Sequence, residues 1–248
     1  INSNKVTIGT WITIGHHSIV EILSSAKFDW FAIDMEHSPI SYNKAQELIV
    51  AADSKNIPVL IRVEKNNEMS IKKAMDCGAA GVIVPMVCNS EDAKKAVNYT
   101  KYPLSGKRGV GLARAQNYGI GFEEYHEWLD EHSVIIVQIE HINAVKNLNS
   151  IISIDGIDGC IIGPYDLSAS MGIPGDFNSK KLNETVKLIE QECLKNKFPI
   201  GFHVIKPDSE LVLEKIDKGY SFIGFSLDFL FLGEKSRFEM KELSNVKK

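Results

Sequence analysis

Short runs of apolar residues alternate along the whole chain with segments of helical periodicity. Each run is rich in Ile, Val or Phe, and most lack the polar alternation of a half-exposed antiparallel strand. Near-continuous apolar runs are typical of strands that are buried on both faces. They predict strands at residues 6–14, 30–34, 58–63, 81–85, 134–139, 159–163, 199–203 and 222–226.

The segments between these runs place apolar residues three and four positions apart, as the buried face of a helix requires. This spacing is clearest at residues 43–55 and 178–196, and a further helix is expected near 90–99. Ser90 and the Pro207-Asp208 pair predict two helix starts, and Gly78 and Gly219 follow helix ends.

A strand followed by a helix, repeated eight times with short links, predicts a parallel sheet closed into a (β/α)₈ barrel, an α/β fold. The 248 residues match the usual length of this fold, about 250 residues. No repeat or linker interrupts the pattern, so we expect a single domain over residues 1–248. The fourth crossover is the exception, with an enlarged loop at about 101–133 that we expect to be functional or to contain small elements of its own.

Composition excludes several classes of protein. Hydrophobic residues make up 44% of the chain and charged residues 24%, which supports a sizeable core and excludes disorder. A net charge of −4 without a basic segment argues against a nucleic-acid partner. No apolar run is long enough to cross a membrane, and the four cysteines form no CxxC pair. We therefore expect a cytoplasmic protein with reduced thiols and no membrane partner.

Polar residues gather where the predicted strands end, which is where barrels of this type build their active sites. They are Asp34, Glu36 and His37 after the second strand, Arg62 and Glu64 after the third, Gln138, Glu140 and His141 after the fifth, Gly163 to Asp166 after the sixth, His203 on the seventh, and Ser226 and Asp228 after the eighth.

Glu140 and Asp166 end neighbouring strands and could offer two carboxylates to one cation. Mg²⁺ and Mn²⁺ prefer oxygen ligands and often need only two protein carboxylates together with substrate oxygens and water. The alternative is that Glu140 caps the next helix and Asp166 forms a turn. The spacing alone leaves both interpretations open.

Asp34 and His37 form a D-x-x-H step just past the second strand. A carboxylate that orients a histidine makes it a tuned general base, although a single histidine near a strand end is more often structural. Arg62 ends an apolar strand, where its charge needs a partner. It either forms a buried salt bridge with Asp34 or Glu64, or binds a substrate carboxylate or a developing enolate oxygen.

Several other chemistries have no support in the sequence. The G-x-G-x-x-G nucleotide motif is absent, the seventh and eighth strands offer no glycine-paired phosphate cradle, and no cysteine has the context of a nucleophile. Lysines on the predicted strands are too few to suggest a Schiff base. An aldolase on this scaffold would therefore have to use a metal.

Six segments resemble the HpcH/HpaI aldolase family, and they occur in the family's order between Gly9 and Asp228. The D-x-E-H and G-P-x-D-L-S segments are specific in combination. The six segments are FAIDMEHSP (31–39), VLIRV (59–63), GAAGVIVPMV (78–87), KRGVG (107–111), QIE (138–140) and GPYDLSASMG (163–172).

This resemblance implies a barrel of the phosphoenolpyruvate/pyruvate-binding type and a metal-dependent (class II) aldolase. Such an enzyme reversibly cleaves a 4-hydroxy-2-oxo acid into pyruvate and an aldehyde, as 4-hydroxy-2-oxoheptanedioate and 2-dehydro-3-deoxyglucarate aldolases do. The implied cofactor is Mg²⁺, Mn²⁺ or Co²⁺. The implied assembly is a homo-oligomer, a hexamer built from pairs that exchange a C-terminal helix.

The resemblance also implies a role for each site residue. The family's metal-binding residues fall on Glu140 and Asp166, its Asp–His dyad on Asp34 and His37, and its enolate-stabilising arginine on Arg62. The expected substrate contacts are Gln138, Gly163, Pro164 and Tyr165; Trp11 and His203 are further candidates, and Asp76 matches an aspartate that acts near a neighbouring subunit's site.

Three departures from the family pattern lie at the rim: a bulky Tyr165, residues 64–67 in place of a proline-containing turn, and His203 with Phe202 on the seventh strand. They bear on which aldehyde the enzyme accepts more than on the metal chemistry.

Alternatives are a lyase for a citramalyl- or malyl-CoA-like ester, which would need a basic groove that the sequence lacks, and an oxaloacetate-type decarboxylase. A catalytically silent barrel would have no reason to keep this acid, base and arginine set together.

Overall fold

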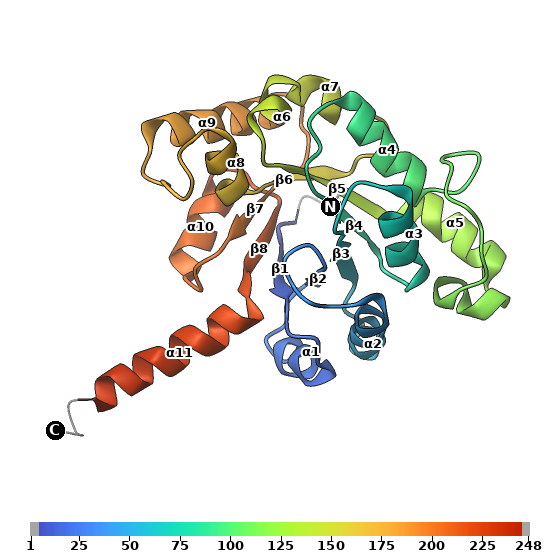
Figure 1. The fold of residues 1–248 in the computed structure, drawn as a ribbon, viewed down its shortest axis with the longest axis horizontal. Helices are drawn as coiled ribbons and strands as arrows, with labels where there is room; N and C mark the ends of the chain where they lie inside the picture. Colours follow the sequence, from blue (N-terminus) through green and yellow to red (C-terminus); the bar gives the residue numbers. More distant parts are fainter. Residues whose placement is uncertain (1–4, 245–248) are drawn as a thin grey trace.

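The computed structural model describes residues 5–244, and in it the strands close into a parallel barrel in sequence order (Figure 1). Each predicted strand is present, and its ends differ from the prediction by no more than two residues. The strands are β1 (Thr7–Ile12), β2 (Trp30–Asp34), β3 (Val59–Arg62), β4 (Gly81–Val84), β5 (Val134–Ile139), β6 (Gly159–Ile162), β7 (Ile200–Val204) and β8 (Phe222–Leu227).

Helices surround this barrel and follow the strands in the chain. They are α1 (His17–Ser24), α2 (Tyr42–Asp53), α3 (Glu68–Asp76), α4 (Ser90–Thr100), α5 (Phe122–His132), α6 (Ile142–Lys146), α7 (Leu148–Ile152), α8 (Pro164–Ser170), α9 (Lys180–Lys195), α10 (Ser209–Asp217) and α11 (Asp228–Leu243). Within the described residues, no helix is long and apolar enough to cross a membrane.

The helix boundaries agree with the local signals, with one correction. Asp208 caps α10, and Gly78 and Gly219 both have positive φ just past a helix end, a conformation that glycine adopts without steric cost. The predicted cap Ser90 is wrong by one residue. Asn89 caps α4 instead, because its Oδ1 accepts a hydrogen bond from the Asp92 N–H at 3.0 Å.

Large side chains fill the interior of the barrel. Trp30 and Phe222 are buried there, and each takes the space next to a glycine on a neighbouring strand. A Cβ atom on Gly9 would lie 2.1 Å from the Trp30 ring, and one on Gly201 would lie 2.1 Å from the Phe222 ring. The barrel is therefore a packed core, and chemistry is confined to its ends.

The fourth crossover contains small elements, as expected from its length. A short 3₁₀ segment, η1 (Arg114–Gly119), precedes α5. Arg108 fixes this region to the barrel: it is fully buried, its Nη2 lies 2.5 Å from Asp76 Oδ1, and its Nη1 lies 3.0 Å from the Tyr125 hydroxyl. The crossover is thus a packed part of the fold.

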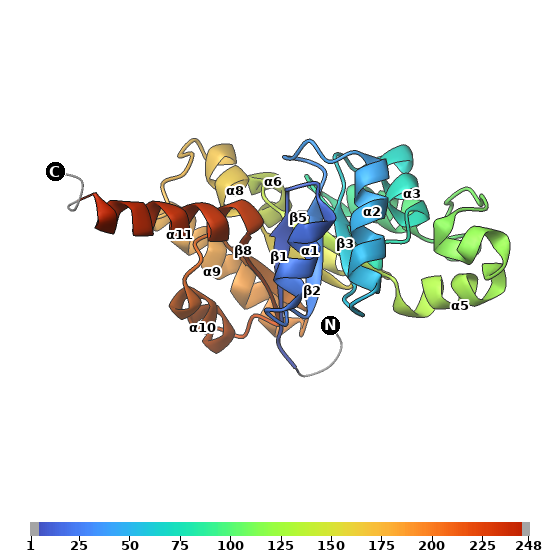
Figure 2. The same cartoon turned by 90° about the horizontal axis from the view of Figure 1, so that it is seen from below.

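The last helix leaves the barrel. Figures 1 and 2 show α11 extending away from the other elements, so that it does not cover the strands as the other helices do. Near its start, the Phe231 ring packs against Phe28 and Phe225, with centroids 6.2 and 5.2 Å away. Farther along, the large apolar side chains are exposed: Leu232, Phe238, Met240 and Leu243.

Candidate active site

Asp34 and Arg62 form a two-pronged ion pair at the C-terminal end of the barrel. They are register partners at the ends of β2 and β3. The Arg62 Nε donates to Asp34 Oδ1 at 3.0 Å, and Nη2 donates to Oδ2 at 2.6 Å. Burial opposes ionisation of Asp34, but the hydrogen bonds and positive charge of Arg62 hold its pKa below the usual value. Both groups are therefore charged, and the fork of Arg62 is fixed in orientation.

Asp34 also shapes the turn that follows β2. Its Oδ1 accepts hydrogen bonds from the backbone N–H groups of Glu36 at 3.0 Å and His37 at 3.1 Å. The expected contact between Asp34 and the His37 ring is not among the hydrogen bonds of the described residues. The ring instead lies near another carboxylate, with His37 Nε2 3.7 Å from Glu36 Oε2.

Glu36 carries a carboxylate oxygen that is buried and lacks a hydrogen-bond donor among the described residues. This atom, Oε2, lies 3.6 Å from Arg62 Nε. Burial raises the pKa of Glu36 to about 7, and the negative charges of Asp34 and Asp166 act in the same direction while Arg62 opposes them. Glu36 therefore shares an electrostatic environment with groups on β3 and at the end of β6.

Glu140 follows β5 and is held by two neighbours. Its Oε1 accepts a hydrogen bond from the Met86 N–H at 2.7 Å, and its Oε2 accepts one from the Gln138 amide. Met86 has a φ of 53°, an uncommon conformation for a residue with a side chain, and it aims this N–H at the carboxylate. Gly163 leaves room on the other side, because a Cβ atom there would lie 2.9 Å from Glu140 Oε2.

The carboxylates of Glu36, Glu140 and Asp166 repel one another. Burial raises the pKa of Glu140 to about 7, and the charges of Glu36 and Asp166 contribute to this rise. Asp166 lies in the first turn of α8, directly beyond the end of β6. Repulsion of this kind is relieved when a cation binds between acidic groups.

The oxygen atoms at this end of the barrel fit a hard divalent cation. Gln138 Oε1 is buried without a donor among the described residues, as is Glu36 Oε2, so acceptor capacity is unused. In residues 5–244, no three acidic, histidine or cysteine side chains form a complete ligand set. A cation here would take Glu140 and Asp166 as two expected ligands and substrate or water oxygens as the others.

Trp11 packs against the guanidinium group of Arg62. The guanidinium carbon of Arg62 lies 4.4 Å from the centroid of the Trp11 ring, a cation–π distance. On the other side, the rings of Trp11 and His203 have centroids 5.0 Å apart. Burial, together with the nearby Arg62, lowers the pKa of His203 to about 3. His203 is therefore a neutral group that packs under the site.

Tyr165 stands at the rim, one residue before Asp166. Pro164 is buried at the start of α8, whereas Tyr165 is exposed. Its ring meets Phe177 edge-on, with centroids 4.7 Å apart. Figure 2 shows that the loop between α8 and α9 rises at the same end of the barrel as the loop that follows β2. Both rings are exposed.

Comparison with known proteins identifies the family. Residues 7–229 match the family model described as HpcH/HpaI aldolase/citrate lyase. The chain belongs to this family. It is 32% identical to a hydroxypyruvate/pyruvate aldolase of Roseobacter denitrificans, covering 94% of this chain and 90% of that one. It is also 32% identical to a 4-hydroxy-2-oxo-heptane-1,7-dioate aldolase of Salmonella dublin, covering 94% and 88%.

A solved structure from the same family has the same fold. An HpcH/HpaI aldolase/citrate lyase family protein from Burkholderia cenocepacia superposes with a TM-score of 0.91 at 26% identity, covering 98% of this chain and 96% of that one. Membership in the HpcH/HpaI family makes the protein a carbon–carbon lyase of the aldolase type.

Several polar residues of this HpcH/HpaI family member lie apart from the carboxylates and have structural partners. Asp76 pairs with Arg108, and Glu64 accepts hydrogen bonds from the Tyr42 hydroxyl at 2.7 Å and Ser70 Oγ at 3.0 Å. His141 caps α6, and the buried Asp228 accepts hydrogen bonds from the backbone N–H groups of residues 13 and 14 at 2.8 Å each.

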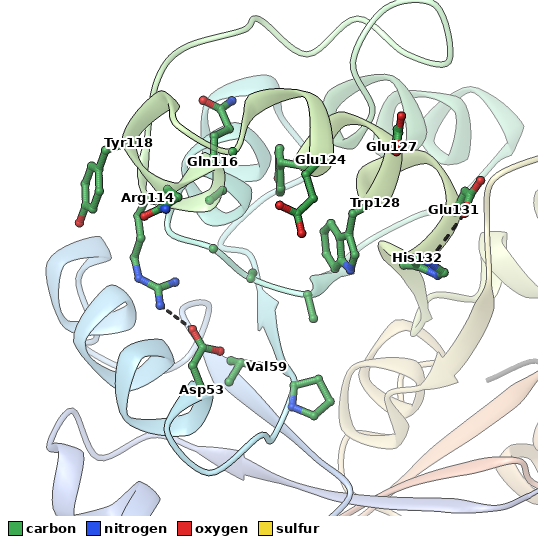
Figure 3. A pocket seen from close by; sticks show the side chains of 18 residues that line it. Asp53, Val59, Arg114, Gln116, Tyr118, Glu124, Glu127, Trp128, Glu131 and His132 are labelled. Atoms are coloured by element: carbon green, nitrogen blue, oxygen red, sulfur yellow. Dashed lines mark hydrogen bonds and ion pairs between the residues drawn. The ribbon is translucent and has the colours of Figure 1, made fainter.

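The aldolase also has a cleft of about 800 Å³ at the opposite end of the barrel, where β3 and β4 begin. Figure 3 shows Arg114 and Asp53 paired across it, 2.5 Å apart, with Glu124, Glu127 and Glu131 on α5. None of the expected site residues lines this cleft, so it is separate from the chemistry described above.

Glu36 was expected at this end of the barrel, but the sequence assigned it no role. Of the alternatives for Arg62, the ion pair with Asp34 is present in the structure, whereas Glu64 pairs with Tyr42 and Ser70 instead.

Proposed function

We propose that this protein is a metal-dependent aldolase that reversibly cleaves a 4-hydroxy-2-oxo acid into pyruvate and an aldehyde. One observation carries the proposal: Glu140 and Asp166 follow the ends of two paired strands, at the same end of the barrel as an arginine that Asp34 holds in place. A cation and an anionic 2-oxo acid together would satisfy this arrangement. The aldolase names of the relatives support the same class of substrate.

Glu140 and Asp166 would hold the divalent cation, Mg²⁺, Mn²⁺ or Co²⁺. When bound, such a cation supplies Lewis-acid polarisation of the substrate's 2-oxo group. The Met86 N–H and the Gln138 amide keep Glu140 in place for this role. Gly163 keeps the space beside Glu140 open, because any larger residue would fill it.

Arg62 would bind the anionic part of the substrate and share the charge of the enolate that forms. Asp34 on the neighbouring strand fixes the guanidinium, and the Trp11 ring centroid lies 4.4 Å from the guanidinium carbon. A single fixed donor of this kind contributes about 2.7–4 kcal/mol, or about 10²–10³ in rate. We assign this share to Arg62.

His37 would move the proton of the 4-hydroxyl group. Its side chain is 59% exposed at the rim, within reach of a substrate held by Arg62. In the cleavage direction the ring accepts the hydroxyl proton as the C3–C4 bond breaks, and it returns the proton in the aldol direction.

We further propose that the protein is a homo-oligomer in which α11 of one copy packs against another, and that six copies assemble as the family resemblance implies. The exposed side chains of Leu232, Met240 and Leu243 on α11 support this proposal, because packing against a second copy would remove them from water. The four free cysteines support placement in a reducing compartment, the cytoplasm.

The test is an aldol assay with metal-stripped protein. The protein is incubated with pyruvate and a panel of short aldehydes, and Mn²⁺, Mg²⁺ or Co²⁺ is then restored. We expect no product before the metal is added and a 4-hydroxy-2-oxo acid afterwards. Activity that persists unchanged after chelation would contradict the mechanism, and activity on a CoA ester alone would replace the substrate class.

A further inference from the structure

The side chain of His203 points into the barrel at the end that holds the site. On β7, Gly201 faces the interior, because the Phe222 ring of the inner cluster occupies the space next to it. His203 lies two residues farther toward the C-terminal end of the same strand, and residues two apart on a strand face the same side. Its ring packs against Trp11, which belongs to the same inner cluster.

The rings of His203 and Trp11 each carry a nitrogen atom without a partner. The Nε2 atom of His203 and the Nε1 atom of Trp11 are buried, and neither has a hydrogen-bond partner among the described residues. Both residues adjoin Gly224 on β8. Gly224 is the register partner of His203, and a Cβ atom on Gly224 would lie 2.7 Å from Trp11 Nε1. A larger residue at this position would therefore fill the space that Trp11 Nε1 faces.

The two nitrogen atoms have opposite hydrogen-bonding character. The indole N–H of Trp11 can only donate. The neutral His203 ring forms a hydrogen bond with the Ser226 backbone that favours its protonation, so the ring donates to the carbonyl there. Because Nε2 has no partner, this donor is Nδ1, and Nε2 is left as an acceptor. A hydroxyl group satisfies both nitrogens, since it accepts one hydrogen bond and donates another.

The position of Arg62 identifies which substrate group would meet these atoms. Its guanidinium carbon lies 4.4 Å from the Trp11 ring centroid, and we have proposed that Arg62 binds the enolate oxygen on C2. The substrate carboxylate cannot donate to His203, and the methyl group of pyruvate can neither donate nor accept. The 4-hydroxyl group is assigned to His37. A hydroxyl group on C3, the carbon bonded to C2, meets both requirements.

We propose that Trp11 and His203 form a hydroxyl-binding subsite that selects a 3-hydroxy-2-oxo acid over pyruvate, an inference that rests on the proposed aldolase function. Trp11 Nε1–H donates to the oxygen of the C3 hydroxyl group, and this hydroxyl donates to His203 Nε2. Hydroxypyruvate is the smallest acid of this class. Pyruvate leaves both nitrogens without this partner, and a site built to bind a hydroxyl group discriminates against an analogue that lacks it.

The experiment measures enolate formation without an aldehyde. Exchange of the C3 protons for deuterium in D₂O is followed by mass spectrometry for hydroxypyruvate and pyruvate with Mn²⁺ present, after subtraction of the rate without protein. The ratio of the two second-order rate constants is compared between wild type and variants. We expect His203→Leu and Trp11→Phe each to lower the ratio of hydroxypyruvate to pyruvate about tenfold, the effect of one hydrogen bond between neutral groups.

Two further variants test the subsite as a unit. His203→Gln keeps an acceptor and should lower the ratio less than His203→Leu does. The double variant of Trp11→Phe and His203→Leu should lower the ratio by up to about 10²-fold, because both hydrogen bonds are lost. The matched control is His141→Asn, which replaces a histidine at the same end of the barrel with another residue that can cap α6, and its ratio should not change. Thermal melts establish that each variant is folded.

The possible results are distinct. A ratio that both His203→Leu and Trp11→Phe leave unchanged would overturn the inference and would indicate that a water molecule satisfies the two nitrogens. Equal losses with both acids would also overturn it, because they would limit the two rings to the support of Arg62. Exchange of pyruvate alone by the wild-type protein would overturn this inference and leave the proposed function standing, whereas exchange of neither acid would overturn the proposed function as well.

Discussion

Single charged residues at the strand ends determine what this barrel can do. The site contains one permanent positive charge, Arg62, among four carboxylates: Asp34, Glu36, Glu140 and Asp166. Only one of these carboxylates forms a close pair with it. The remaining negative charge stays unbalanced at the rim, where a bound cation would neutralise it.

The shape of Arg62 is as important as its charge. In Arg62→Lys the positive charge remains, but the planar fork that holds Asp34 at two points is lost. We expect kcat/KM for aldol cleavage to fall about 10²–10³-fold, the contribution of one fixed donor. Steady-state kinetics with a thermal melt as a folding control measure this, and a loss of less than about threefold would contradict the role.

His203 should make the fold less stable in acid. Its pKa is about 3 in the folded protein and ordinarily 6.5, so below pH 6.5 the unfolded chain binds a proton that the folded one does not. The stabilisation from the neutral ring is therefore complete above pH 6.5 and is lost progressively as pH falls toward 3. Its slope reaches at most about 1.4 kcal/mol per pH unit.

The variant His203→Gln removes this titration. Urea unfolding of both proteins between pH 7.5 and 4 should show the stability difference shifting in favour of the variant as pH falls. Parallel stability curves would show that His203 does not titrate in this range.

At the residue scale, the sequence predicted where the site residues lie better than it predicted which of their side chains pair. Residues at strand ends must share one end of the barrel, so Glu140, Asp166 and Arg62 could be placed from periodicity alone. The ion pair between Arg62 and Asp34 was one of the alternatives, but the choice between Asp34 and Glu64 could not be made because it depends on side-chain directions across β2 and β3. For the same reason the unpaired oxygen of Glu36 had no signature in the sequence.

At the scale of elements, the strands and the presence of small elements in the long crossover were predictable, but the packing of that crossover was not. Runs buried on both faces are continuous, so their limits are visible in the composition. In the crossover, Arg108 packs between Tyr102 and Tyr125, with its guanidinium carbon 4.8 and 5.7 Å from the two ring centroids. A buried arginine cannot be distinguished from an exposed one by periodicity. The helix cap was misplaced by one residue because Asn89 and Ser90 are both good cap formers.

The stability of the crossover should depend on the ion pair between Arg108 and Asp76. In Asp76→Asn the fully buried guanidinium loses its charged partner. Breaking a buried pair costs about 3–5 kcal/mol, and we expect about 3 because Asp76 keeps 28% of its side chain exposed. Chemical denaturation measures the loss, and Asp53→Asn, which breaks the more exposed pair with Arg114, is the matched control. Equal losses in the two variants would contradict this assignment.

At the scale of the whole molecule, α11 is the element whose packing is incomplete. Leu232, Met240 and Leu243 are exposed on a helix that extends away from the barrel, and burial of apolar side chains is favourable. The proposed assembly buries this surface against a second copy.

Leu232→Glu tests the assembly. Leu232 is exposed on α11, and a charge there should disrupt an apolar interface without unfolding the barrel. We expect the wild-type protein to sediment as an oligomer and the variant as a smaller species, with Lys241→Gln on the same helix unchanged. An identical sedimentation coefficient for wild type and Leu232→Glu would contradict the role of α11.

The enlarged crossover at residues 101–133 also lies, in the sequence, between two sets of site residues. Arg62, Asp34 and His37, which we propose to bind the organic anion and to move its proton, precede it in the chain. Both proposed cation ligands, Glu140 and Asp166, follow it. With these assignments neither half of the chain holds a complete set, and β4 must pair with β5 to bring the two sets together. A chain divided within this crossover should therefore regain turnover only when its halves reassociate.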